Sequence, residues 1–441
     1  MMLLGRSLML LASMALVAAA PYEPPRQGVR TAYRNVSLID GTGQPMRRGM
    51  VVLTNGELIS AVVPEGQLSA AQLAGARQVD LAGKFLIPGL IDTHQHLATP
   101  PDRAAAEARL KRDVFSGITA TRDMADDLRQ IADLTRAARV GEIASPDIAY
   151  AALMAGRSFF SDPRTQAIAL GAKAGEVPWE QAIDDGSDIM LAIARAKGTY
   201  ASAVKIYANL PAGLVFKITE EAHRQGMRVW AHGMVFPATP FEVVDSGADT
   251  VSHTCYLAYQ AMEKRPDDYQ HRYPIDASLF LRDNPVMMRL FTDMAHRGTV
   301  LDATLHVYRE VEAEAREQHK PPLCTVELAG RLTNQAYRSG VEISAGTDGD
   351  TPLTEPWPSL FDELELLHEA AGLSSMAVLE AATRTGAKAM GKEQEMGGIV
   401  PGKLANMAVL SRNPLDDVHN FRSVVLTVKR GRQFPRNEFT P

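Results

Sequence analysis

Short apolar segments alternate with amphipathic segments along this chain from about residue 85 to about residue 395. An amphipathic segment between two apolar ones predicts a helix that connects two parallel strands. Over a stretch of this length, the pattern predicts a distorted (β/α)8 barrel at residues 85–395. Four helix–strand pairs show it most clearly: 217–225 with 227–232, 240–246 with 249–253, 290–297 with 299–305, and 326–339 with 341–348.

The predicted barrel strands end in, or one residue before, polar side chains that commonly bind metals. The carboxyl ends of all strands meet on one face of a (β/α)8 barrel, and catalytic groups gather there. A single histidine at a strand end is usually a buried residue with satisfied hydrogen bonds, but five strand ends that each supply such a group indicate a shared site. The residues are His94, His96, Lys205, His232, His253 and Asp348.

The first of these strand ends carries two histidines, His94 and His96, after the apolar run that begins at Phe85. Side chains alternate between the two faces of a strand, so positions 94 and 96 point to the same side. Two adjacent imidazoles at a strand end can form half of a divalent metal site. The alternative is a pair of hydrogen-bonded histidines at the mouth of the barrel.

Both ends of the chain outside the predicted barrel have β-type patterns. Residues 28–84 alternate apolar and polar positions, with hairpin signals at Asp40-Gly41 and Asn55-Gly56. A second β-rich stretch covers residues 396–435. We expect the two stretches to form one composite β-sandwich from both termini.

Composition and charge narrow the functional classes. The chain has 441 residues, is 46% hydrophobic and carries a formal charge of −6 without a lysine- and arginine-rich block. This argues against a nucleic-acid partner; the partner that we expect is a small-molecule substrate. After the first residues, no stretch is long and apolar enough to predict a membrane span. A homo-oligomer is compatible with these features.

The first 20 residues resemble a secretory signal peptide. Arg6 supplies a basic residue, Leu8 to Val17 form an apolar run, and Ala18-Ala19-Ala20 supply small residues for cleavage. The sequence therefore predicts an exported protein, periplasmic or secreted; an uncleaved anchor is the alternative. The two cysteines, Cys255 and Cys324, could pair in such a compartment or remain as two free thiols.

The motifs at the strand ends resemble those of the amidohydrolase superfamily. They are Pro88-Gly-Leu-Ile-Asp-Thr-His94-Gln-His96, Val204-Lys205-Ile-Tyr, Ala231-His232, Ser252-His253, Gly346-Thr-Asp348 and Pro401-Gly-Lys-Leu-Ala, in the order that the superfamily has them. The resemblance implies that His94 and His96 are the first-strand ligands and that Lys205 is the bridging lysine of the fourth strand. It also implies that His232 and His253 are the fifth- and sixth-strand ligands and that Asp348 is the catalytic aspartate.

This assignment implies two divalent metal ions, with zinc as the expected metal, and a carboxylated Lys205 between them. A free lysine is cationic and would repel metals, whereas its carbamate is an anion with two oxygens. Such a pair shares a hydroxide nucleophile at neutral pH, and Asp348 could pass its proton to the leaving nitrogen. The alternative for Lys205 is an ordinary amine beside a mononuclear site.

Within the superfamily, two motifs are most similar to the imidazolonepropionase-related group, which contains prolidase-like metallo-dipeptidases. They are Gly117-Ile-Thr-Ala-Thr-Arg122-Asp123-Met and Val204-Lys205-Ile-Tyr207. Tyr207 shares the face of Lys205 and could hydrogen-bond a substrate carbonyl, or could be a barrel residue with a satisfied hydroxyl. The chain departs from these dipeptidases after the third strand, where Arg157 could bind a substrate carboxylate or form a surface salt bridge. His306 follows the seventh strand and is a further candidate substrate contact.

Together these features predict an exported metal-dependent amidohydrolase that cleaves a dipeptide or an N-acyl amino acid by attack of a metal-bridging hydroxide. A cyclic amide, a lactone or another ester is the alternative substrate, because the same nucleophile attacks all of them. A non-catalytic scaffold is the alternative outside enzymes.

Overall fold

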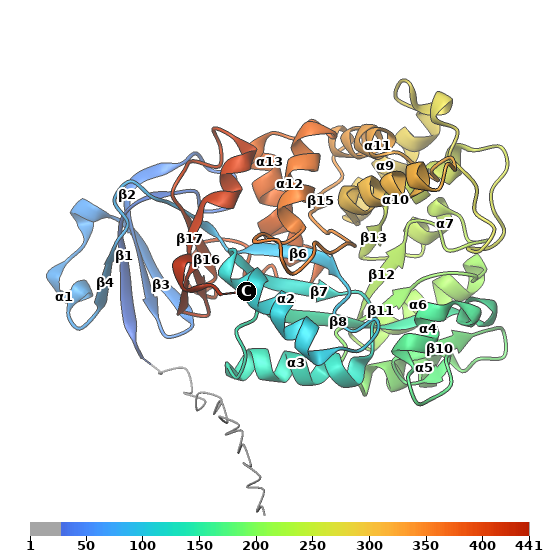
Figure 1. The fold of residues 1–441 in the computed structure, drawn as a ribbon, viewed down its shortest axis with the longest axis horizontal. Coiled ribbons are helices and arrows are strands. Elements are labelled where there is room, and N and C mark those ends of the chain that lie inside the picture. The colour runs from blue at the N-terminus through green and yellow to red at the C-terminus, as the bar shows by residue number, and fades with distance from the viewer. Residues whose placement is uncertain (1–27, 441) are drawn as a thin grey trace, which may run out of the picture.

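The computed structural model describes residues 28–440, arranged as a β-sheet domain beside a larger barrel (Figure 1). The predicted signal segment, residues 1–20, lies outside the described residues. Among the residues described, no helix is long and apolar enough to cross a membrane.

One sheet brings the two ends of the chain together, with the blue N-terminal strands beside the red C-terminal ones in Figure 1. Its order is β18-β17-β16-β5-β1-β2-β3, with β4 paired to β1. Leu38, Leu86 and Val409 pack in one buried apolar cluster, so both termini share a core. The prediction of a composite β-domain is confirmed. The strands are β1 (Arg30–Leu38), β2 (Arg47–Asn55), β3 (Leu58–Pro64), β4 (Arg77–Asp80), β5 (Phe85–Pro88), β16 (Met407–Leu410), β17 (Val424–Lys429) and β18 (Arg432–Pro435).

The apolar run before His94 forms two strands instead of one. The first, β5, belongs to the terminal sheet, where it pairs antiparallel with β16 and parallel with β1. The second, β6 (Leu90–Gln95), is the first barrel strand. A Cβ on Gly89 would lie 2.2 Å from Oγ1 of Thr119, so only glycine lets the chain pass this closely between the two sheets. The sheet domain therefore extends to residue 88, beyond the predicted limit of 84.

Eight parallel strands form the barrel, which confirms the predicted fold. The amide of Thr93 donates to the carbonyl of Ala345 and the amide of Asp348 donates to that of His94, both at 2.9 Å, so the last strand meets the first. The short strands β9 (Glu176–Val177) and β10 (Glu180–Ile183) extend the sheet beside β8. The other barrel strands are β7 (Ile118–Asp123), β8 (Asp147–Gly156), β11 (Ala203–Ile206), β12 (Arg228–His232), β13 (Thr250–Ser252), β14 (Val300–Asp302) and β15 (Ile343–Ser344).

Helices connect the strands and cover the outside of the barrel (Figure 1). Two of the predicted strands are shorter than expected. The segment 299–305 ends as a strand at Asp302, and α10 begins at Leu305, so His306 lies in the first turn of a helix. The segment 341–348 is a strand only at Ile343–Ser344, and Asp348 lies in the loop that follows.

The helices of the described chain are α1 (Ala70–Leu73), α2 (Arg103–Phe115), α3 (Leu128–Val140), α4 (Pro163–Ile168), α5 (Ile189–Lys197), α6 (Ala212–Arg224), α7 (Pro240–Asp245), α8 (Thr254–Leu257), α9 (Pro285–Arg297), α10 (Leu305–Glu317), α11 (Val326–Arg338), α12 (Leu360–Glu369), α13 (Ser375–Glu380) and α14 (Gly386–Ala389). A π-helical turn at Ala381–Thr385 joins α13 to α14.

Cys255 and Cys324 form a disulfide, with their Cα atoms 6.3 Å apart. It links the first turn of α8 to the segment before α11, across a sequence separation of 69 residues. Because Cys255 follows His253 by two residues, the bond ties the end of β13 to the outer layer of helices. Of the two states that the sequence leaves open for the cysteines, the structure has the paired one.

Candidate metal centre

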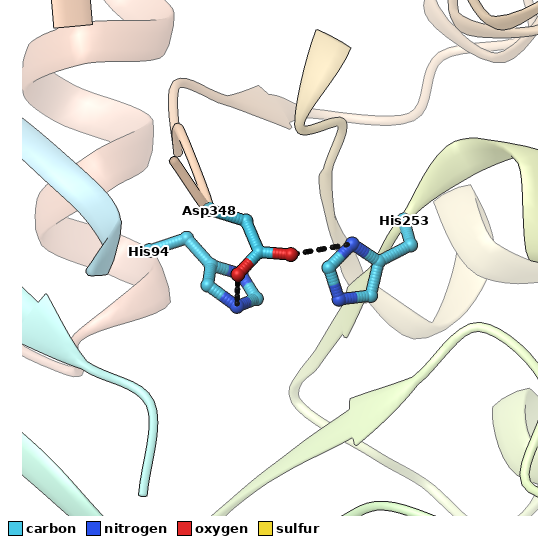
Figure 2. Close-up of side chains that lie close together, drawn as sticks. All are labelled: His94, His253 and Asp348. Atoms are coloured by element: carbon cyan, nitrogen blue, oxygen red, sulfur yellow. Dashed lines mark ion pairs between the residues drawn. The ribbon is translucent and has the colours of Figure 1, made fainter. Parts of the chain in front are cut away.

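Three of the predicted ligands surround the carboxylate of Asp348 at the carboxyl ends of the strands. Nε2 of His94 and Nε2 of His96 lie 3.4 and 3.5 Å from Oδ1 of Asp348, and Nδ1 of His253 lies 3.7 Å from Oδ2. Figure 2 shows His94 and His253 on opposite sides of this carboxylate. His94, His253 and Asp348 alone offer three ligand atoms that all lie within 4.8 Å of one another, which suits a metal ion.

The other two predicted ligands continue the cluster. The ring of His232 lies 4.5 Å from that of His253 and 4.8 Å from that of Tyr207, measured between centroids. The amine of Lys205 lies 4.8 Å from the centre of the Tyr207 ring and donates to the carbonyl of Met124 at 3.1 Å. The six predicted metal ligands therefore gather on one face of the barrel although they come from five strands.

The imidazoles are held through their Nδ1 atoms. Nδ1 of His94 lies 2.7 Å from Asp302, Nδ1 of His96 lies 2.6 Å from Asp126, and Nδ1 of His232 lies 3.2 Å from the carbonyl of Met234. An acceptor at Nδ1 leaves the lone pair on Nε2, as in many metal-binding histidines. Nε2 of His94 is buried and has no hydrogen-bond partner within residues 28–440. A buried polar atom without a partner is costly, and a metal ion would satisfy it.

His253 has a different environment. Its Nδ1 lies 2.9 Å from the hydroxyl of Thr304 as well as near Asp348. Its backbone is in the left-handed region, with φ of 73°, and Asp348 has φ of 47°. Strained backbone of this kind is commonly kept where it places a functional side chain.

Burial controls the charges of the site. Burial, with Lys205 nearby, lowers the pKa of His94 well below its ordinary value. Burial and the neighbouring imidazoles do the same to the pKa values of His232 and His253. Neutral imidazoles keep the lone pairs that a metal needs. Burial also lowers the pKa of Lys205 and raises that of Asp348, the latter against the opposing effect of His96.

Asp302 on β14 is a central residue of the site that the sequence analysis missed. Its fully buried carboxylate accepts hydrogen bonds from Thr93 at 2.7 Å, Ser252 at 2.9 Å and Arg122 at 3.0 Å, besides its contact with His94. The only signal in the sequence is an acidic residue within the apolar segment that forms β14. A Cβ on Gly346 would lie 2.2 Å from Oδ1 of Asp302, so glycine there lets the last strand approach this carboxylate.

We expect Asp302→Asn to weaken metal binding about 10- to 100-fold. Substitution of the residue that hydrogen-bonds a metal-binding histidine usually costs that much in metal affinity. It should also destabilise the fold by about 3–5 kcal/mol, since it leaves the buried guanidinium of Arg122 without its charged partner. Metal titration and thermal unfolding measure the two effects. Asp245→Asn, which removes half of an exposed ion pair with Arg297, is the matched control. Equal metal affinity in both variants would contradict this role of Asp302.

The three predicted substrate contacts have different positions. The hydroxyl of Tyr207 lies 3.2 Å from that of Tyr269, beside the metal centre. The side chain of Arg157 is 68% exposed and pairs with Asp184 at 2.8 Å. Of the two roles considered for Arg157, this is the surface salt bridge. His306 is buried, and its amide donates to Glu363 at 2.7 Å.

A cavity of about 110 Å³ adjoins the metal centre between the loops that follow β6 and β15. His96 and Asp348 are among its lining residues, together with Arg109 and Asp350, which pair at 2.5 Å. Two of the predicted metal ligands thus line this cavity.

The fold and the site together define a (β/α)8 barrel protein with a candidate metal centre at the carboxyl ends of its strands. The amidohydrolase family model matches residues 85–434, and the chain therefore belongs to the amidohydrolase family.

Two relatives are imidazolonepropionases, in agreement with the group that the motifs indicate. The imidazolonepropionase of Arthrobacter sp. (strain FB24) is 28% identical over 232 residues, which cover 48% of this chain and 57% of that protein. The chain thus spans little more than half the length of this relative. The imidazolonepropionase of Legionella pneumophila (strain Paris) is 23% identical over 398 residues, which cover 86% of this chain and 91% of that protein.

Solved structures of low sequence identity share the fold. A Xaa-Pro dipeptidase with bound methionine in its active site has a TM-score of 0.72 at 20% identity, over 92% of this chain and all of that one. The ochratoxinase of A. niger has a TM-score of 0.72 at 19% identity, over 94% of this chain and 98% of that one.

Proposed function

We propose that this protein is an exported, metal-dependent amidohydrolase that cleaves a dipeptide or an N-acyl amino acid. The observation that carries the proposal is the buried Nε2 of His94, which has no hydrogen-bond partner among the described residues and lies beside Asp348 and His96. The dipeptidase neighbour and the pattern of residues 1–20 support the substrate class and the export, respectively.

The donor set suits two divalent ions, and zinc fits it best because the ligands are imidazoles and carboxylates. His94, His96, His232, His253 and Asp348 would hold the ions, with a carboxylated Lys205 between them. Burial lowers the pKa of Lys205, a direction that favours the modification, since carbon dioxide reacts with an uncharged amine. When bound, such ions supply an activated water and polarise the scissile carbonyl.

The side chains around the centre would perform the remaining steps. Asp348 would accept the proton of the attacking water and deliver it to the leaving nitrogen. Burial raises its pKa, which suits a carboxylate that must first take up and then release a proton. Tyr207 would donate its phenolic hydrogen to the substrate carbonyl as negative charge develops there.

Protein purified without any chelator is expected to carry close to two divalent ions per chain. Elemental analysis against protein concentration measures this, and removal of the metal should abolish hydrolysis until zinc is restored. One ion or fewer per chain would contradict the binuclear site and favour the mononuclear alternative.

A screen of dipeptides, N-acyl amino acids, cyclic amides and lactones with the metal-loaded protein tests the substrate class. We expect amide cleavage in the first two groups. Cleavage confined to lactones or cyclic amides would contradict the proposed substrate class and support the alternative substrates. No cleavage of any of the four groups would contradict the proposed function.

A further inference from the structure

Arg272 lies in the loop between the short 3₁₀ helices Ala258–Ala261 and Ala277–Phe280, after β13. Its Nε donates to the carbonyl of Tyr269 at 2.6 Å, and one terminal nitrogen donates to the hydroxyl of Tyr256. The guanidinium lies 3.6 Å from the centre of the Tyr269 ring. Within residues 28–440, no carboxylate oxygen comes within 4.0 Å of its nitrogens. The charge of Arg272 is therefore oriented but not neutralised.

A second arginine, Arg164 on α4, also contacts Tyr269. It pairs with Asp162 at 2.8 Å and lies 3.3 Å from the hydroxyl of Tyr207 and 3.4 Å from that of Tyr269. Asp162 pairs with Arg164 and not with Arg272, so the charge of Arg272 has no carboxylate partner among the described residues. Arg272 is half-buried, so its unpaired guanidinium can still be reached by an anionic ligand, with which it would form charged hydrogen bonds.

This positive charge lies directly beside the metal centre. The ring of Tyr256, which receives the hydrogen bond from Arg272, lies 4.2 Å from the ring of His232. The ring of Tyr207, which Arg164 contacts, lies 4.8 Å from the same histidine. One aromatic ring therefore separates each guanidinium from a candidate metal ligand. If a substrate binds at the metal centre, a substrate atom close to the reacting bond would lie near this positive charge.

We propose that Arg272 binds the carboxylate of the amino acid that leaves, so that the enzyme requires a free carboxylate next to the scissile amide. This inference rests on the proposed function and narrows its substrate class. In a dipeptide or an N-acyl amino acid, a single carbon separates that carboxylate from the leaving nitrogen. The planar fork of an arginine suits a carboxylate better than a point charge does. Arg157, for which the sequence left open a substrate carboxylate or a surface salt bridge, lies at the surface in an ion pair with Asp184.

The test compares each dipeptide of a panel with its C-terminal amide, which is neutral at that end. We expect the metal-loaded wild type to prefer the free acids by more than about 10-fold in kcat/KM, since a charged hydrogen bond at a binding site contributes on that scale. In Arg272→Gln, kcat/KM for the acids should fall about 10- to 100-fold, mainly through KM, while that for the amides changes less than about threefold. Arg272→Lys should restore part of the preference.

Arg265→Gln is the matched control, because Arg265 is exposed on the same loop and contacts only a backbone carbonyl among the described residues. It should leave both kcat/KM values unchanged. Equal losses for acids and amides in a folded Arg272→Gln, or a loss of the preference in Arg157→Gln instead, would overturn the assignment. Tyr256→Phe, which removes only the hydroxyl that orients Arg272, tests the same contact if Arg272→Gln fails to fold; an unchanged preference in it would also overturn the assignment.

The outcomes separate this inference from the proposed function. Wild-type protein that cleaves acids and amides equally well keeps the amidohydrolase activity and overturns the carboxylate site alone. Wild-type protein that cleaves neither contradicts the proposed function and, with it, this inference.

Discussion

Asp348→Asn is expected to fold, to keep metal on its histidines and to lose about 10²–10⁴-fold in turnover, the usual contribution of a general acid–base group. Asparagine has nearly the same shape but cannot accept the proton of an attacking water. The carboxylate lies within 3.7 Å of three histidines, so some metal affinity should be lost as well. Turnover should therefore be measured with zinc in excess, beside the metal content of the variant.

The matched control for Asp348 is Glu355→Gln, which makes the same chemical change at an exposed position of the same loop. It should leave turnover and metal content at wild-type values. If Asp348→Asn turns over within a few-fold of the wild type in excess zinc, Asp348 has no role as the proton acceptor.

Lys205→Ala should remove most of the activity and one of the two metal ions. Lys205 is fully buried and its amine has only the carbonyl of Met124 as a hydrogen-bond acceptor among the described residues, which is poor solvation for an ammonium group. As a carbamate it would instead be an anionic ligand. Loss of a ligand should cost more than the about 10- to 100-fold that outer-shell substitutions cost. Metal analysis and kcat of the variant measure this.

Added formate, acetate or bicarbonate should restore part of the activity of Lys205→Ala, because a small carboxylate can occupy the space of the carbamate. Lys217→Ala, at an exposed position on α6, serves as the control and should respond to none of them. A Lys205→Ala variant with two ions and wild-type turnover would show that this lysine is an ordinary amine.

The sequence by itself determined the barrel and the set of candidate ligands. Alternation of strands and helices is local, and it forces the strands to run parallel. Parallel strands in a closed barrel place all their carboxyl ends on one face. Residues as far apart as His94 and Asp348 could therefore be assigned to one site without knowledge of any contact between them. The same local reading identified the β-type ends of the chain.

Only the tertiary structure decided which groups support and surround those ligands. Asp302 accepts hydrogen bonds from residues on β6, β7 and β13, and no local pattern distinguishes it from other acidic residues near a strand. The division of the run before His94 at Gly89 depends on the close approach of Thr119, and the Cys255–Cys324 bond depends on the packing of two distant segments.

The tertiary structure also decided which arginine we propose as the site for the substrate carboxylate. Arg157 and Arg272 carry the same charge and differ in their partners: Asp184 neutralises the first, while the second lies against Tyr256 and Tyr269 without a carboxylate among the described residues. Periodicity determines which way a side chain points from its own strand or helix. Burial, pairing and the energetic cost of an uncompensated charge arise only when distant segments pack together, so they are properties of the folded chain.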